Sequence, residues 1–146
     1  MSQYFDLGDD TLWNPSHGAS RMFRRQVAVF EAELELPSGI GPMENDECRI
    51  SPDAFETFVN ALLARHRTTS HAIWLALSES FTAIVLVLAE RAAIEVDWAR
   101  LGAAPEAALE DVQVSAVTGM SAPADGAAWA AGLREKAREL GRRMPR

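Results

Sequence analysis

The segment Ser70–Ile94 constrains the fold most, because it is long, strongly apolar and periodic. Its large apolar residues recur at spacings of four, three and four, which places them along one side of a helix. Its polar residues fall mostly on the opposite side. The pattern predicts an amphipathic helix whose apolar seam packs against the rest of the chain. The seam comprises Leu77, Phe81, Ile84 and Leu88, with Trp74 at its upstream end, and the polar side comprises Ser78, Glu79, Thr82 and Glu90.

The same segment is the one candidate for a membrane span. Its longest uninterrupted apolar run, Ala83–Ala89, falls far short of the ~20 residues that a spanning helix needs. Polar residues 78–80 also interrupt it near its middle. We therefore expect a buried helix of a globular protein and no membrane association.

Apolar residues repeat at helical spacing in three further segments, Arg21–Leu36, Ser51–Arg67 and Ala127–Arg142, and each is predicted to be a helix. Residues 106–117 start with a helical pattern and end with an alternating one, so we expect a helix followed by irregular structure. Two short extended stretches within Tyr4–Trp13 flank a turn at residues 8–10, which predicts a small hairpin.

These elements predict a mainly α fold, a compact bundle of four to five helices with a small N-terminal β hairpin. A chain of 146 residues fits a single domain, 1–146. The segment Leu36–Glu47 has no periodicity and is predicted to be a long loop, with a short strand at Cys48–Ile50. Loops of about a dozen residues are uncommon in compact domains and are enriched in binding functions.

The charge of the chain weighs against two classes of partner. Fourteen basic and 21 acidic residues give a formal net charge of −7. Nucleic acids and anionic membranes bind by attracting lysine and arginine, so neither is expected. An acidic surface instead favours a basic protein partner or a cationic ligand. A homo-oligomer is left open.

The cysteine content and the N-terminus indicate a cytoplasmic protein. Cys48 is the single cysteine, so no internal disulfide can form, which fits a reducing compartment. Residues 1–10 carry three aspartates instead of the basic and apolar segments of a secretory signal.

The predicted loop is the first candidate site. Its acidic cluster is predicted to dock a basic protein partner, and the partner-binding residues are Met43, Glu44, Asp46 and Glu47. The cluster offers enough oxygen atoms for calcium, but its order does not match a calcium-binding loop, so no metal is expected.

The second candidate site lies around the turn before the central helix. His66 and His71 flank residues 68–70, and Glu79 lies two helical turns beyond His71. Together they would bind a small ligand or a metal, or perform acid–base chemistry, if the turn brought them together. The competing interpretations are that His66 caps the edge of the core with a hydrogen bond and that Glu79 faces solvent.

Nucleophilic chemistry has no support in the sequence. No serine lies in a nucleophile-elbow pattern, and Cys48 stands beside Asp46 and Glu47, which disfavour a thiolate. We therefore assign no catalytic residue and no cofactor.

Two stretches carry a resemblance. Leu12–Ser16 and Arg25–Glu31, the latter running on to Gly39–Asp46, resemble a family of small actinobacterial proteins of unknown function. The resemblance implies a cytoplasmic bacterial protein and brings no activity with it.

Two functional hypotheses follow. The first is a non-enzymatic, acidic helical module that binds another protein, as a regulator or an immunity-type partner does. The alternative is a helical bundle that binds or transforms a small molecule in a pocket near His66, His71 and Glu79. The sequence favours the first and leaves catalysis open.

Overall fold

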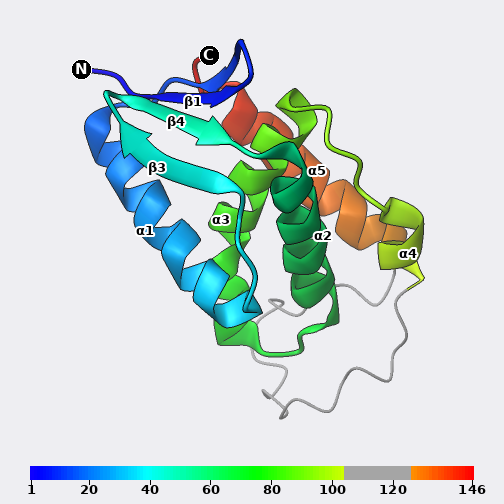
Figure 1. Cartoon of the computed structure of the whole chain (residues 1–146). Helices are drawn as coiled ribbons and strands as arrows, with labels where there is room; N and C mark the ends of the chain where they lie inside the picture. Colours follow the sequence, from blue (N-terminus) through cyan, green and yellow to red (C-terminus); the bar gives the residue numbers. More distant parts are fainter. Residues whose placement is uncertain (104–125) are drawn as a thin grey trace.

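The computed structural model describes residues 1–103 and 126–146, which form an α+β fold (Figure 1). The described residues comprise five helices and a four-stranded sheet, so the predicted mainly α bundle with a small hairpin is wrong. The predicted element at 106–117 lies outside the described residues. In chain order the elements are β1 Tyr4–Leu7, β2 Asp10–Trp13, α1 His17–Leu34, β3 Ile40–Glu44, β4 Glu47–Ile50, α2 Pro52–Thr68, α3 Ala72–Arg91, α4 Trp98–Gly102 and α5 Gly126–Gly141.

The sheet joins two hairpins. Its strand order is β2-β1-β4-β3, with antiparallel pairs at both ends and a parallel pair, β1 with β4, in the middle. The parallel pair sets Phe5 opposite Cys48, and both side chains are fully buried. Helix α1 connects the two hairpins, as a parallel pairing requires a crossover. One face of the sheet therefore closes the end of the helical layer (Figure 1).

The second hairpin lies where a loop was predicted. Its pairing shifts between Ile40 and Met43, and such an irregularity removes the alternation by which a strand is recognised. Pro42 is tolerated because β3 is an edge strand. Asn45 and Asp46 both have positive φ, 51° and 65°, as the tight turns of hairpins require. A loop-like composition thus encodes a strand pair.

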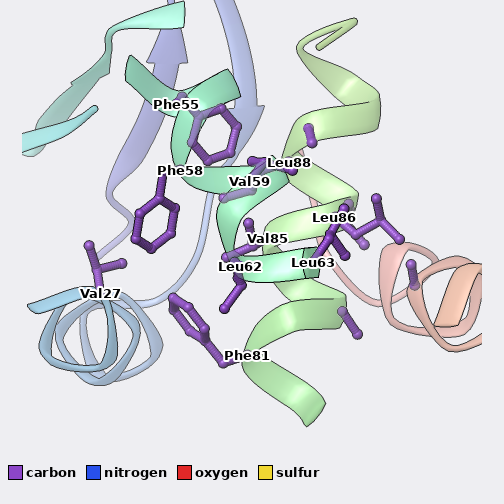
Figure 2. Packing of buried hydrophobic residues seen from close by; sticks show 14 of the residues in the cluster. Val27, Phe55, Phe58, Val59, Leu62, Leu63, Phe81, Val85, Leu86 and Leu88 are labelled. Carbon is purple, nitrogen blue, oxygen red and sulfur yellow. The ribbon is translucent and has the colours of Figure 1, made fainter. Parts of the chain in front are cut away.

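The core is centred on Phe81 of α3. Its ring stacks on Phe30 of α1, with centroids 4.3 Å apart and planes 5° from parallel, and lies 5.6 Å from the ring of Phe23. On the side of α2, Phe58 and Leu62 complete the packing around Phe81 (Figure 2). Because aromatic side chains bury large areas, this cluster sets the position of α1 over α2 and α3.

The predicted seam of α3 is only partly correct. Phe81 and Leu88 are buried, but Ile84 is half-buried and Leu77 is 73% exposed. The polar side was also misjudged, because Ser78 and Thr82 are fully buried. Helices α2 and α5 both pack on α3 (Figure 1). Small hydroxyl side chains fit where helices approach closely. The Ser78 hydroxyl donates to the carbonyl of Leu75.

Among the described residues, α3 is long and apolar enough to cross a membrane by length and composition alone, and 56% of its most apolar stretch is buried inside the molecule. The core helix of a globular protein has the same length and composition.

Arg91, at the end of α3, ties the C-terminal tail to the sheet. Its guanidinium donates to the carbonyl of Leu12 in β2 at 2.6 Å, and to those of Gly141 and Met144 at 2.9 and 2.8 Å. The tail reaches β2 directly as well, since the Asn14 amide donates to the carbonyl of Pro145. The two chain ends consequently lie at the same end of the molecule (Figure 1).

Gly39 provides a test of this fold, because a side chain at this position would collide with α2. Its φ is +75°, and an added Cβ would lie 2.6 Å from the amide nitrogen of Phe55 and 2.7 Å from the carbonyl oxygen of Ser51. We expect Gly39→Ala to lower the free energy of unfolding by more than about 1 kcal/mol, measured by urea denaturation.

The control is Gly132→Ala on α5, where an added Cβ meets nothing within 4 Å. Helix propensity predicts that this variant gains about 0.5–1 kcal/mol. Equal effects of the two substitutions would contradict the described path of the chain before β3.

Candidate functional site

The predicted acidic loop forms the turn between β3 and β4. Glu44 and Glu47 face each other across the turn, and both are exposed. Met43 belongs to β3 and packs, half-buried, against the core. The four predicted partner-binding residues, Met43, Glu44, Asp46 and Glu47, therefore do not form one free surface.

Asp46 has partners within the chain. Its carboxylate accepts a hydrogen bond from the Gln3 amide at 3.1 Å and lies 3.3 Å from Nε2 of His17. Its backbone carbonyl accepts from the Tyr4 amide at 2.8 Å. These contacts join the hairpin turn to β1 and to the start of α1, so Asp46 has a structural role here.

The second predicted site is split between two places. His71 caps α3, because its Nδ1 accepts a hydrogen bond from the Trp74 amide at 3.2 Å. Glu79 is half-exposed and pairs with Lys136 of α5, whose Nζ lies 3.1 Å from its carboxylate. His66 is buried on α2 and interacts electrostatically with Glu79 and Lys136. The structure thus places His66 within electrostatic range of Glu79 and leaves His71 at the helix start.

The tautomer of His66 follows from its partner. Nδ1 accepts a hydrogen bond from the indole Nε1–H of Trp129 at 3.1 Å. Because an indole N–H can only donate, Nδ1 carries no proton and the neutral ring has its hydrogen on Nε2. That Nε2–H is buried and has no hydrogen-bond partner among the described residues.

Burial also keeps His66 neutral. Removal from water lowers the pKa of His66 below its ordinary value of 6.5, and the Lys136 ammonium lowers it further, while the Glu79 carboxylate opposes both. Protonating Nδ1 would break the bond to Trp129. The hydrogen bond between His66 of α2 and Trp129 of α5 therefore forms only when His66 is neutral.

Cys48 is a buried thiol. Its sulfur donates to the carbonyl of Gly41 at 3.2 Å. Burial raises the pKa of Cys48 to about 11, with smaller opposing effects from neighbouring charges. Since the thiolate is the nucleophilic form, Cys48 is unreactive at neutral pH.

The largest unexplained feature is an apolar surface. Among the described residues, Leu77 and Ile73 of α3 are 73% and 60% exposed, and Met22 and Val29 of α1 are 65% and 57% exposed. Single exposed apolar residues are ordinary, but neighbouring ones mark interaction surfaces.

Helix geometry places these four residues on one side of the contact between α1 and α3. On α3, Leu77 and Ile73 lie about 40° and 80° from Phe81, whereas Val85 lies on its other side and packs against α2 (Figure 2). On α1, Met22 and Val29 lie about 80° and 100° around the helix from the buried Phe30.

Val27 lies on the other side of Phe30, toward α2 (Figure 2). Both exposed pairs therefore lie on the side away from α2. We call this surface the α1–α3 face, defined by Met22, Val29, Ile73 and Leu77 with the half-buried Ile84 at its margin.

The sequence interpretation missed this surface because it assigned Leu77 to the buried seam of the central helix and gave Met22, Val29 and Ile73 no role. A signal was present in α1. Its core stripe is complete without Met22 and Val29, which are 80–100° away from Phe30 on the helix. Two large apolar residues beyond a complete stripe indicate a second contact.

The described residues thus define a small α+β protein in which a mixed sheet caps a helical layer and one helical face is left apolar and exposed. The chain belongs to a family of unknown function, DUF6086, whose model matches residues 1–146. This confirms the predicted membership in an uncharacterised family and does not show an actinobacterial origin. No curated protein and no solved structure matches the chain.

The hydrogen bond between His66 and Trp129 makes the free energy of unfolding depend on pH. The pKa of His66 is lower in the folded protein than in the unfolded chain, so the unfolded chain binds a proton first as pH falls. The contribution of His66 is complete above its unfolded pKa of 6.5 and decreases as pH falls toward the lowered value.

We expect His66→Leu to flatten the decrease in unfolding free energy between neutral and mildly acidic pH, measured by urea denaturation. A second variant, His71→Gln, removes the titratable Nδ1 cap of α3 and measures the share of the pH dependence that comes from that position. An unchanged pH dependence in His66→Leu would contradict the neutral, buried state of His66.

Proposed function

We propose that this protein is a non-enzymatic interaction module that binds a protein partner through the α1–α3 face. The observation that supports the proposal is the exposure of Leu77 and Ile73 one helical turn apart, beside Met22 and Val29. Each of these side chains leaves apolar area in water, and covering it is favourable by about 25 cal/mol per Å². A partner supplies that cover.

The chemistry of the face determines the kind of contact. Its five residues carry no charge. Contact at these five residues is therefore apolar packing, while the exposed Arg25 and Glu33, four residues either side of Val29 on α1, flank the face with one charge of each sign. Aromatic and aliphatic side chains are the groups that dominate such contacts.

The titratable groups of the alternative pocket have roles inside the fold. His71 caps α3, Glu79 pairs with Lys136, and Nδ1 of His66 accepts a hydrogen bond from Trp129. One observation still favours a ligand, namely the buried Nε2–H of His66, which has no acceptor among the described residues. Ligand binding at His66 is accordingly the second candidate function, below partner binding.

The test uses a photo-crosslinking amino acid at position 77, introduced into the full chain in its native host. We expect a discrete cross-linked product containing one defined protein, because Leu77 is at the centre of the face. The control places the same amino acid at Ala131, an exposed position on α5.

Ile73→Glu should abolish the product from position 77, because it buries a charge at the contact. It should change the unfolding free energy by no more than about 0.5 kcal/mol, as usual for an exposed residue. Equal cross-linking from positions 77 and 131 would contradict the proposal.

A further inference from the structure

The strand β2 lies at one edge of the sheet that the described residues form. An edge strand presents backbone N–H and C=O groups with which the strand of another chain can pair. At the opposite edge, β3 contains Pro42, which has no N–H to offer. Strand β2 contains no proline, and its Thr11 and Trp13 are residue types that favour strands. The edge at β2 therefore needs another form of protection.

The hydrogen bonds next to β2 identify the backbone groups on its open side. The Gln3 amide donates to the carbonyl of Pro15, so that carbonyl points toward the side of β1. Backbone groups alternate between the two sides of an extended chain. The amide of Asn14 and the carbonyl of Leu12 therefore point away from β1. These are the two groups to which an added strand would bond.

Both groups already have partners within the chain. The Asn14 amide donates to the carbonyl of Pro145 at 2.9 Å, so the C-terminal tail pairs with Asn14 as an added strand would. Pro145 has no N–H with which to complete that pairing. The carbonyl of Leu12 instead accepts a hydrogen bond from Nη1 of Arg91 at 2.6 Å. The arginine thus supplies the donor that the proline lacks.

The tail is held in place where it makes this contact. Met144 is 9% exposed and belongs to the hydrophobic core. Its carbonyl and that of Gly141 accept hydrogen bonds from Nη2 of Arg91 at 2.8 and 2.9 Å. A guanidinium suits this position, because it presents several donors in a fixed plane. One side chain therefore binds both the strand edge and the tail, at the end of the molecule where the two termini lie (Figure 1).

We propose that Arg91, Met144 and Pro145 form a cap on the open edge of β2, which prevents the β2 strand of a second copy of this chain from pairing with the sheet. We call these three residues the edge cap. The edge cap is separate from the α1–α3 face, so the inference goes beyond the proposed function and does not depend on it.

Hydrogen exchange tests the contacts of the edge cap. In the wild-type chain the Asn14 amide should be protected from exchange, measured by NMR in deuterated water. Met144→Asp places a charge in a buried position and should release the tail. Exchange at Asn14 should then be faster by about tenfold or more, as the loss of an ordinary hydrogen bond predicts. The control is Arg143→Gln, because Arg143 is exposed in the same tail and pairs with Glu139.

Sedimentation tests the consequence. Met144→Asp should self-associate with rising concentration more strongly than the wild-type chain and Arg143→Gln, measured by analytical ultracentrifugation. Adding Asn14→Pro to Met144→Asp removes the exposed donor and should reverse the gain. Met144→Ala removes most of the buried side chain without adding a charge, and should show the same changes to a smaller extent. It replaces Met144→Asp if that variant lacks native circular dichroism.

An Asn14 amide that exchanges in the wild-type chain as fast as in an unfolded peptide would overturn the edge cap. Unchanged exchange at Asn14 in a folded Met144 variant would overturn the role of the tail. Faster exchange without added self-association would overturn the proposed protection, and so would association that persists with Asn14→Pro. The cross-link from position 77 is a separate measurement, so either proposal can fail without the other.

Discussion

The packing of Phe81 against Phe30 and Phe23 is the contact on which the rest of the structure depends. Phe81 lies on α3, which packs against α2 on one side and α5 on another (Figure 1). An element that contacts α3 is therefore placed relative to both of these helices. Aromatic pairs in offset or edge arrangements contribute about 0.5–1.5 kcal/mol beyond the area they bury. The position of α1 follows from this cluster, and the path of the chain into β3 follows from α1, because the Glu31 carboxylate accepts from the amide of Ser38 at 2.9 Å.

The sequence predicted the helices well and the sheet poorly, for a physical reason. Helical periodicity is repeated over many turns, so α2 and α3 are recognised from their own residues, whereas a strand pair of four or five residues has no redundancy. The shift in pairing between Ile40 and Met43 removed what alternation there was. The strands of the N-terminal hairpin were predicted from the turn at Gly8, although their pairing also shifts, between Phe5 and Asp6.

The surroundings of the candidate site residues could not be predicted from the sequence. His66 and Trp129 are 63 positions apart, and neither local pattern indicates the other. Nor does periodicity state how many neighbours a helix has. With α1, α2 and α5 around it, α3 buries Ser78 and Thr82 and exposes Leu77, which inverts the simple division of apolar inside and polar outside. Residue types were sufficient to find the helix and insufficient to orient it.

The apolar character of α3 serves two separate requirements. Its buried residues fill the space between three helices, and that requirement is met without Leu77 or Ile73, which contact water over most of their surface. Polar residues at those two positions would preserve the fold, because exposed helix positions tolerate substitution at little cost in stability. The packing of the described residues therefore does not account for Leu77 and Ile73, whose exposure is the observation behind the proposed contact with a partner.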